Sequence, residues 1–201
     1  SWGSNKSRNN ALIPLRAVFK LAQRDGAITH NPCEGIENGK HQSPEADPMN
    51  VEEMEIFLDW IRKTQHPMWL NYYEYTFFSG LRPSEQIALT WGSVDFNRGY
   101  VRIEKSKVRG LLRQHTKTYK VRDVEFNTRA KQALQRQKDW TFLQGNEVFV
   151  HPSTGLPFTN NASVRLTWNK GLKACGIRHR SSYQTRHTFC TNCLQSGAKI
   201  H

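Results

Sequence analysis

Apolar residues recur at helical spacing in several stretches of the chain. Between residues 9 and 25, Leu12, Leu15, Val18 and Phe19 form one stripe, which predicts an amphipathic helix ending at Gly26. The same spacing predicts a helix that follows Asn50 as its N-cap, and further helices over residues 67–78, 128–140, 160–175 and 184–195.

Two other runs alternate apolar and polar residues, as half-buried strands do. They are Tyr100–Ile103 and Val121–Phe126, and Ser93–Phe96 is a third, shorter candidate. The connection from Lys105 to Lys120 is long, rich in cations and poor in apolar anchors. The pattern therefore predicts a mainly α-helical α+β fold with a small antiparallel three-stranded sheet.

The stretch Thr76–Trp91 predicts a helix, a tight turn and a second helix. Gly80 stands where a helix C-terminus favours a left-handed residue, and Pro83 suits the first turn of a following helix. We expect Ile87 and Trp91 to bury that second helix, which would hold Arg82 at the turn between two buried segments.

The charge of the chain indicates the kind of partner that it binds. The 201 residues include 29 Lys and Arg against 17 Asp and Glu, a formal net charge of +12, which suggests a polyanionic partner. Eleven basic and three acidic residues lie between Arg98 and Lys131, which favours a phosphate-binding edge over a merely solvated face. The candidate DNA-binding residues are Lys105, Lys107, Arg109, Arg113, Lys120 and Arg122, with Arg178 and Arg180 from a basic loop before the last helix.

Other chemistry is poorly supported. No apolar run reaches the roughly 18 residues of a membrane span, and four cysteines in a chain of this length suit a reducing compartment. The spacing His187-x-x-Cys190-x-x-Cys193 invites a zinc interpretation, but a second pair of ligands with clear spacing is missing. We therefore expect buried thiols, and neither a metal nor a cofactor.

Three segments of the chain together resemble the catalytic domain of the tyrosine recombinases, the phage-integrase family. They are Ser79–Glu85, Thr116–Val124 and Tyr183–Phe189, in that order. The resemblance covers residues 48 to 201 and implies an integrase-like catalytic domain over residues 49–201. More weakly, residues 1–34 resemble the truncated end of the family's core-binding (SAM-like) domain, and residues 35–48 are polar, as a linker is.

The resemblance also implies roles for individual residues. Arg82 and Arg186 would converge on one scissile phosphate, and Lys117 would protonate the departing 5′ oxygen. Glu85 and His187 would support them. Tyr183 stands where the family most often has His; a phenol with a reference pKa of about 10 can hydrogen-bond a phosphate but is a poor base near neutrality.

The family's nucleophilic tyrosine lies in helices beyond the segment that contains Arg186. None of the six tyrosines of this chain follows that segment, so we expect a fragment that binds double-stranded DNA but is inactive in cleavage. The intact parent would be a cytoplasmic bacterial or phage protein that acts through a phosphotyrosine and self-associates as a tetramer on DNA. A non-catalytic DNA-binding remnant and a type IB topoisomerase are the alternatives.

Overall fold

The computed structural model describes residues 3–42, 45–114 and 120–198, and Lys117 lies outside them. The chain divides into two compact units, Ser1–Glu45 and Ala46–His201. In the part of the chain that is described, no helix is both long and apolar enough to cross a membrane.

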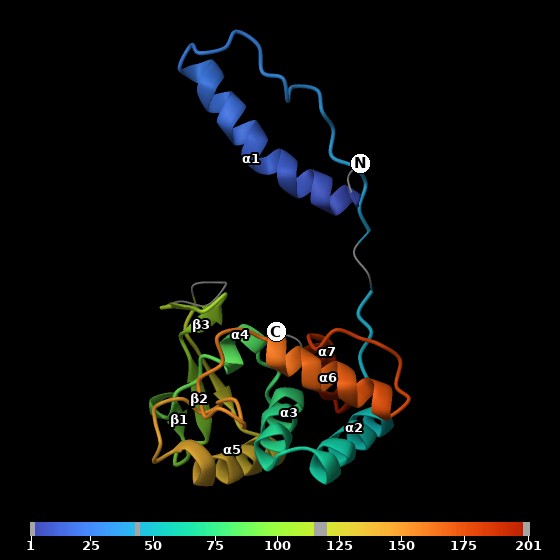
Figure 1. Ribbon diagram of the computed structural model, residues 1–201, viewed down its shortest axis with the longest axis vertical. Helices are drawn as coiled ribbons and strands as arrows, with labels where there is room; N and C mark the ends of the chain where they lie inside the picture. The colour runs from blue at the N-terminus through green and yellow to red at the C-terminus, as the bar shows by residue number, and fades with distance from the viewer. Residues whose placement is uncertain (1–2, 43–44, 115–119, 199–201) are drawn as a thin grey trace. The chain divides into compact units, whose positions relative to one another are not determined.

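The first unit is built on one helix, α1 (Asn5–Arg24), whose first turn is capped by the Ser4 hydroxyl accepting from the Ser7 amide at 3.1 Å. Residues 36–40, inside the segment predicted as a linker, run back along this helix (Figure 1). Asn9 donates to the Gly39 carbonyl at 2.8 Å and Arg16 to the Asn38 side chain at 2.9 Å.

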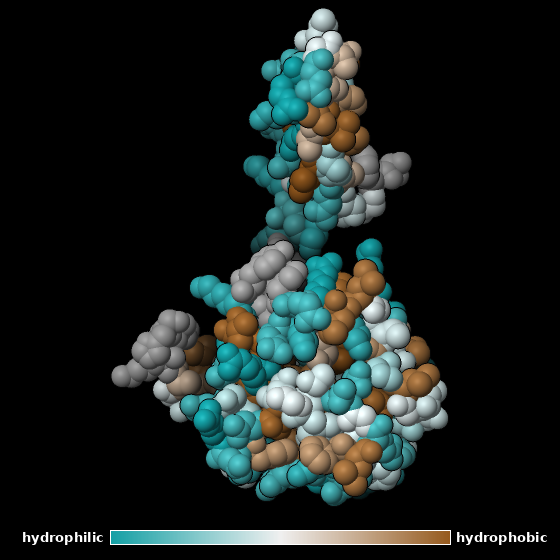
Figure 2. All heavy atoms as spheres, turned by 90° about the vertical axis from the view of Figure 1, so that its left-hand side faces the viewer, coloured by the Kyte–Doolittle hydropathy of each residue, from teal (hydrophilic) through white to brown (hydrophobic). Residues whose placement is uncertain are grey.

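The apolar stripe of α1 is largely uncovered within this unit. Leu12 is buried, whereas Ile13, Val18 and Leu21 are exposed. Figure 2 shows a band of hydrophobic atoms, in brown, next to hydrophilic ones on this unit. The unit is therefore held by hydrogen bonds to the returning chain more than by a core of its own.

The second unit packs helices around a central helix, α3, which contacts α2, α5 and α7. Its rings fill the core: Tyr72, Tyr73 and Phe77 are buried beside Phe57 and Trp168. The helices are α2 (Val51–Thr64), α3 (Pro67–Ser79), α4 (Pro83–Gln86), α5 (Thr128–Thr141), α6 (Ala162–Ala174) and α7 (Gln184–Gln195). The expected cap is confirmed at α2, where Asn50 and Glu53 form a reciprocal capping box, and at α5 the Asn127 side chain accepts from the Ala130 amide.

The predicted antiparallel sheet is confirmed. Its strands β1 (Val94–Asp95), β2 (Tyr100–Ile103) and β5 (Arg122–Glu125) lie in the order β1-β2-β5. Val101 pairs with Val94 on one side and with Val124 on the other, which places three valines in one row. The fold is mainly helical α+β, as predicted.

Two expectations need correction. The helix predicted after Pro83 is a single turn, because α4 ends at Gln86; the following residues lead into a short 3₁₀ helix, η1 (Trp91–Ser93), and Thr90 bridges to Glu147. The cationic connection after β2 also holds a second antiparallel sheet, formed by β3 (Ser106–Val108) and β4 (Leu111–Arg113).

The start of this unit is tied to α7. The amide of Asp47 donates to the Gln184 side chain at 3.1 Å, and the amide of Met49 donates to the Thr188 hydroxyl at 2.9 Å. These bonds fix the N-terminal end of the unit against the last described helix.

Candidate active site

The turn after α3 is shaped by Gly80. Its backbone is left-handed, with φ of 62°, and this conformation ends the helix. Residues other than glycine rarely adopt it. The ring of Phe189, from α7, covers it so closely that a Cβ on Gly80 would lie 2.3 Å from the ring. The glycine therefore permits both the turn and the close approach of α7.

This approach brings the two candidate arginines together. Nη1 of Arg186, on α7, donates to the Gly80 carbonyl oxygen. Arg82 lies two residues beyond Gly80 and is half-buried, with its side chain 23% exposed. Arg186 thus contacts, from α7, the same turn that carries Arg82.

Tyr183 and His187 complete the group at the start of α7. Tyr183 is exposed and interacts with the Arg82 guanidinium, and its ring lies 5.4 Å from the His187 ring in an edge-on arrangement. The hydrogen bond from Arg82 to Glu85, the charge of that carboxylate and the contact with Tyr183 together raise the pKa of Arg82, against the opposing effect of burial. Arg82 is therefore a permanent cation with a phenol beside it.

Glu85 is buried, and its carboxylate is shared by two arginines. It accepts from the Arg82 amide at 3.0 Å and from Arg82 Nη1 at 2.9 Å. It also accepts from Arg122 Nη1 at 3.2 Å and Nη2 at 2.7 Å. Burial alone would raise the pKa of Glu85, but the hydrogen bonds from Arg122 and Arg82 outweigh it and leave the pKa below the ordinary value. Glu85 is thus ionised and supports Arg82, as the sequence suggests, while Arg122 faces this carboxylate.

The basic hairpin lies next to this turn, because β3 packs against α4 (Figure 1). Arg109 and Gly110 form its tip, and the Gly110 amide donates to the Thr159 carbonyl at 2.7 Å. Arg109, Arg113 and Lys120 are exposed, and Lys105 and Lys107 are half-buried. Three of the candidate DNA-binding cations, Lys107, Arg109 and Arg113, therefore belong to a hairpin that packs beside the arginine turn.

The last two candidate DNA-binding residues are engaged in ion pairs. The side chain of Arg180 is 2% exposed and pairs with Glu53 at 2.9 Å and with Asp47 at 3.2 Å. Arg178 is exposed and pairs with Asp47. In this structure the Arg180 guanidinium is enclosed and paired within the domain, where it contributes to packing. The sequence carries no local signal of this, since Glu53 lies 127 residues away.

The cysteines do not form a metal-ligand cluster in the described ranges. No group of three or more His, Cys, Asp and Glu gathers there. Cys33 is buried, as expected of a packed thiol, but Cys190 is exposed and Cys193 is partly so. All four are free thiols.

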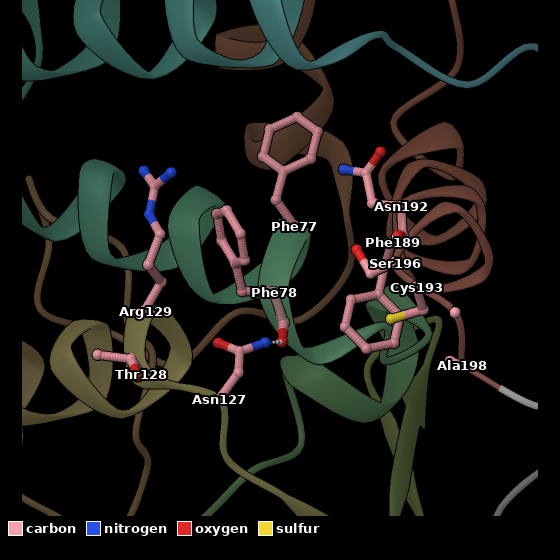
Figure 3. Close-up of a pocket in the computed structure, with 11 residues that line it drawn as sticks. Phe77, Phe78, Asn127, Thr128, Arg129, Phe189, Asn192, Cys193, Ser196 and Ala198 are labelled. Atoms are coloured by element: carbon pink, nitrogen blue, oxygen red, sulfur yellow. Dashed lines mark hydrogen bonds between the residues drawn. The ribbon is translucent and has the colours of Figure 1, made fainter.

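A cavity of about 580 Å³ lies among α3, the start of α5 and the second half of α7 (Figure 3). Phe78 and Phe189 line it, and Asn127 spans its floor by donating to the Phe78 carbonyl at 2.6 Å. Arg129 also lines the cavity, and it is the one cation among the described lining residues. It pairs with Glu55 and Glu74. The cavity is therefore suited to apolar groups and not to a phosphate.

Comparison with known proteins decides the family. A sequence model of the Phage integrase family matches residues 48–201. The chain belongs to the phage integrase family. Membership favours the recombinase interpretation over the type IB topoisomerase alternative, and it covers the whole segment on which the three motifs lie.

Relatives of this chain include bacterial proteins named as integrases and recombinases, and one named as defective. The defective protein IntQ of Escherichia coli (strain K12) is 29% identical over 94% of this chain and 53% of its own length. The prophage integrase IntR of the same strain is 24% identical over 94% of this chain and 51% of its own length. The tyrosine recombinase XerC of Azotobacter vinelandii is 25% identical over 98% and 63%. The chain thus spans about half the length of the first two.

Solved integrase structures share the fold. The Tn1549 transposon integrase, in complex with circular intermediate DNA, matches with a TM-score of 0.77 and 22% identity over 98% of this chain and 68% of that one. A lambda integrase dimer bound to a COC′ core site matches with a TM-score of 0.76 and 15% identity over 98% and 69%. At these identities the likeness concerns the fold.

Proposed function

We propose that this chain is the DNA-contacting core of a site-specific recombinase that cuts and rejoins double-stranded DNA. One observation carries the proposal: Arg82 stands in the turn after α3, Arg186 reaches that turn from α7, and Tyr183 interacts with Arg82. Two fixed guanidinium groups suit the non-bridging oxygens of a phosphodiester, where charge develops during phosphoryl transfer. Integrases of this fold have been solved on DNA.

In this proposal a tyrosine hydroxyl attacks the phosphorus and the 5′ oxygen leaves, which conserves the phosphodiester as a phosphotyrosine bond. Arg82 and Arg186 stabilise the charge on the phosphate, Tyr183 hydrogen-bonds it, and Lys117 gives the leaving oxygen its proton. Attack by a 5′ hydroxyl on the phosphotyrosine reverses these steps and rejoins the strand. Glu85 and His187 hold the cations and the phenol in place.

Cleavage requires an attacking tyrosine, and this requirement bears on the activity of the 201-residue chain. Its six tyrosines all precede Arg186, and Tyr72, Tyr73 and Tyr75 are buried, which raises their pKa. We propose that the chain alone holds DNA without cleaving it, and that the longer protein cleaves it and assembles as a tetramer, as a lambda integrase does on a Holliday junction.

Two assays on the 201-residue chain test this function. Binding to a labelled duplex should weaken steeply as salt rises, because phosphate contacts release counterions. Incubation with nicked duplexes of mixed sequence, followed by a denaturing gel, should give no covalent protein–DNA band. Absence of salt-dependent binding would remove the proposed function, and a covalent band would show that one of the six tyrosines present is an attacker.

A further inference from the structure

Arg122 was expected among the DNA-binding cations, yet it is directed at Glu85. Both of its terminal nitrogens donate to that carboxylate, one to each oxygen, at 3.2 and 2.7 Å. Arg82 gives the same carboxylate its backbone amide and one terminal nitrogen. Arg122 thus makes the two-pronged contact that is the strongest geometry for this pair, and Arg82 makes a one-pronged contact.

It matters that Arg82 and Arg122 share Glu85, because a buried carboxylate is stabilised by as many hydrogen-bond donors as it can accept. The Glu85 side chain is 1% exposed, so water cannot supply the donors that a departing Arg122 would take away. Arg82 already pairs with Glu85, and it would turn its whole fork toward that carboxylate. Its charge would then be cancelled by one carboxylate, and fewer of its N–H groups would be left for another anion.

The charge count points the same way. Arg82, Glu85 and Arg122 together carry one positive charge in excess, whereas Arg82 and Glu85 alone would be neutral. A phosphate is attracted by the first arrangement and not by the second. Arg122 therefore affects an anion at Arg82 without having to touch it.

We propose that Arg122 is a positioning residue, which occupies Glu85 so that Arg82 keeps its free N–H groups for a phosphate oxygen. The inference rests on the proposed function, because it takes the ligand of Arg82 to be a phosphodiester. It differs from a direct phosphate contact by Arg122 in one respect: the need for Arg122 disappears when Glu85 carries no charge.

That difference defines the experiment. Inorganic phosphate is titrated into the ¹⁵N-labelled 201-residue chain, and the side-chain Nε–Hε resonance of Arg82, assigned with Arg82→Lys, reports binding. We expect Arg122→Gln to weaken phosphate binding about ten-fold, Arg122→Lys to weaken it less, and Glu85→Gln with Arg122→Gln to restore it to within about two-fold. Arg102→Gln, at an exposed arginine of β2, is the matched control and should change little.

A double variant as weak as Arg122→Gln would overturn the inference and return Arg122 to direct phosphate contact. If Arg122→Gln does not fold, as judged by circular dichroism, Glu85→Gln is compared with the double variant, and a ten-fold loss between them overturns the inference equally. Failure of the inference alone leaves wild-type binding intact. A wild-type chain whose Arg82 does not respond to phosphate removes both this inference and the proposed function.

Discussion

The guanidinium of Arg186 and the carbonyl oxygen of Gly80 are joined by a hydrogen bond across 106 residues of sequence. The bond ties the last described helix to the turn that holds Arg82. The ring of Phe189, one helical turn further along α7, packs closely against the same glycine. The two arginines are therefore placed by packing at a glycine, and this packing can be tested by itself.

Gly80→Ala should lower the free energy of unfolding, because the new methyl group meets the Phe189 ring and the left-handed backbone is strained. Gly99→Ala is a matched control, since Gly99 has φ of 79° and open space around it. We expect about 1 kcal/mol for Gly99→Ala and about 3 kcal/mol for Gly80→Ala in urea unfolding. Equal losses would mean that Phe189 does not restrict this position.

Replacing Lys107, Arg109 and Arg113 of the hairpin by Ala should flatten the salt dependence of duplex binding. Each lost phosphate contact lowers the slope of log affinity against log salt by about 0.9. The control removes Arg62 and Lys63, which lie at the end of α2, in the opposite part of the domain from the hairpin (Figure 1). A slope that changes only with the control would place the DNA on another face.

Arg180→Ala and Arg178→Ala should differ in stability although both arginines pair with Asp47. Arg180 is buried, so its loss leaves an unfilled space and deprives Glu53 of its partner, at a cost of about 3 kcal/mol. Arg178 is 66% exposed, and its loss should cost under about 1 kcal/mol. Thermal unfolding of both variants measures the difference, and similar melting temperatures would contradict the structural role of Arg180.

Stability should fall in acid partly through Glu85. Its pKa in the folded chain is below the ordinary value of 4.5, so its contribution is present above about pH 4.5 and is lost as the pH falls through the folded pKa. Glu85→Gln should therefore lose less stability than the wild type between about pH 5 and pH 3. The pKa of Glu53 is also lowered, so the stability of the Glu85→Gln variant should still fall somewhat as the pH is lowered. Parallel curves for the two proteins would exclude Glu85 as a contributor.

Local patterns in the sequence predict most elements of the second unit. The final helix matches residues 184–195, and the capping box at Asn50 and the left-handed Gly80 are read directly from residue types. These features depend on neighbours within a few residues. Patterns in the sequence predict such features because the residues that determine them are close together in the chain.

The failures have a different physical origin. Strand β4 is exposed along its whole length. Buried and exposed residues do not alternate in it, so periodicity gives no signal for this strand. The single-turn α4 is followed by a bridge from Thr90 to Glu147, a contact that no local pattern encodes. Arg122 and Arg180 look like any surface cations, and their partners lie 37 and 127 residues away. Charge patterns identify a basic region, but tertiary contacts decide which of its cations remain available.

The hydrogen bonds from Asp47 and Met49 to α7 have a mechanical consequence. The polypeptide enters the second unit at these residues, and they grip the helix that carries Arg186 before the chain turns into α2. Because the Met49 side chain is also part of the hydrophobic core, tension along the incoming chain is transmitted to the Arg186 helix and to the core at the same residue.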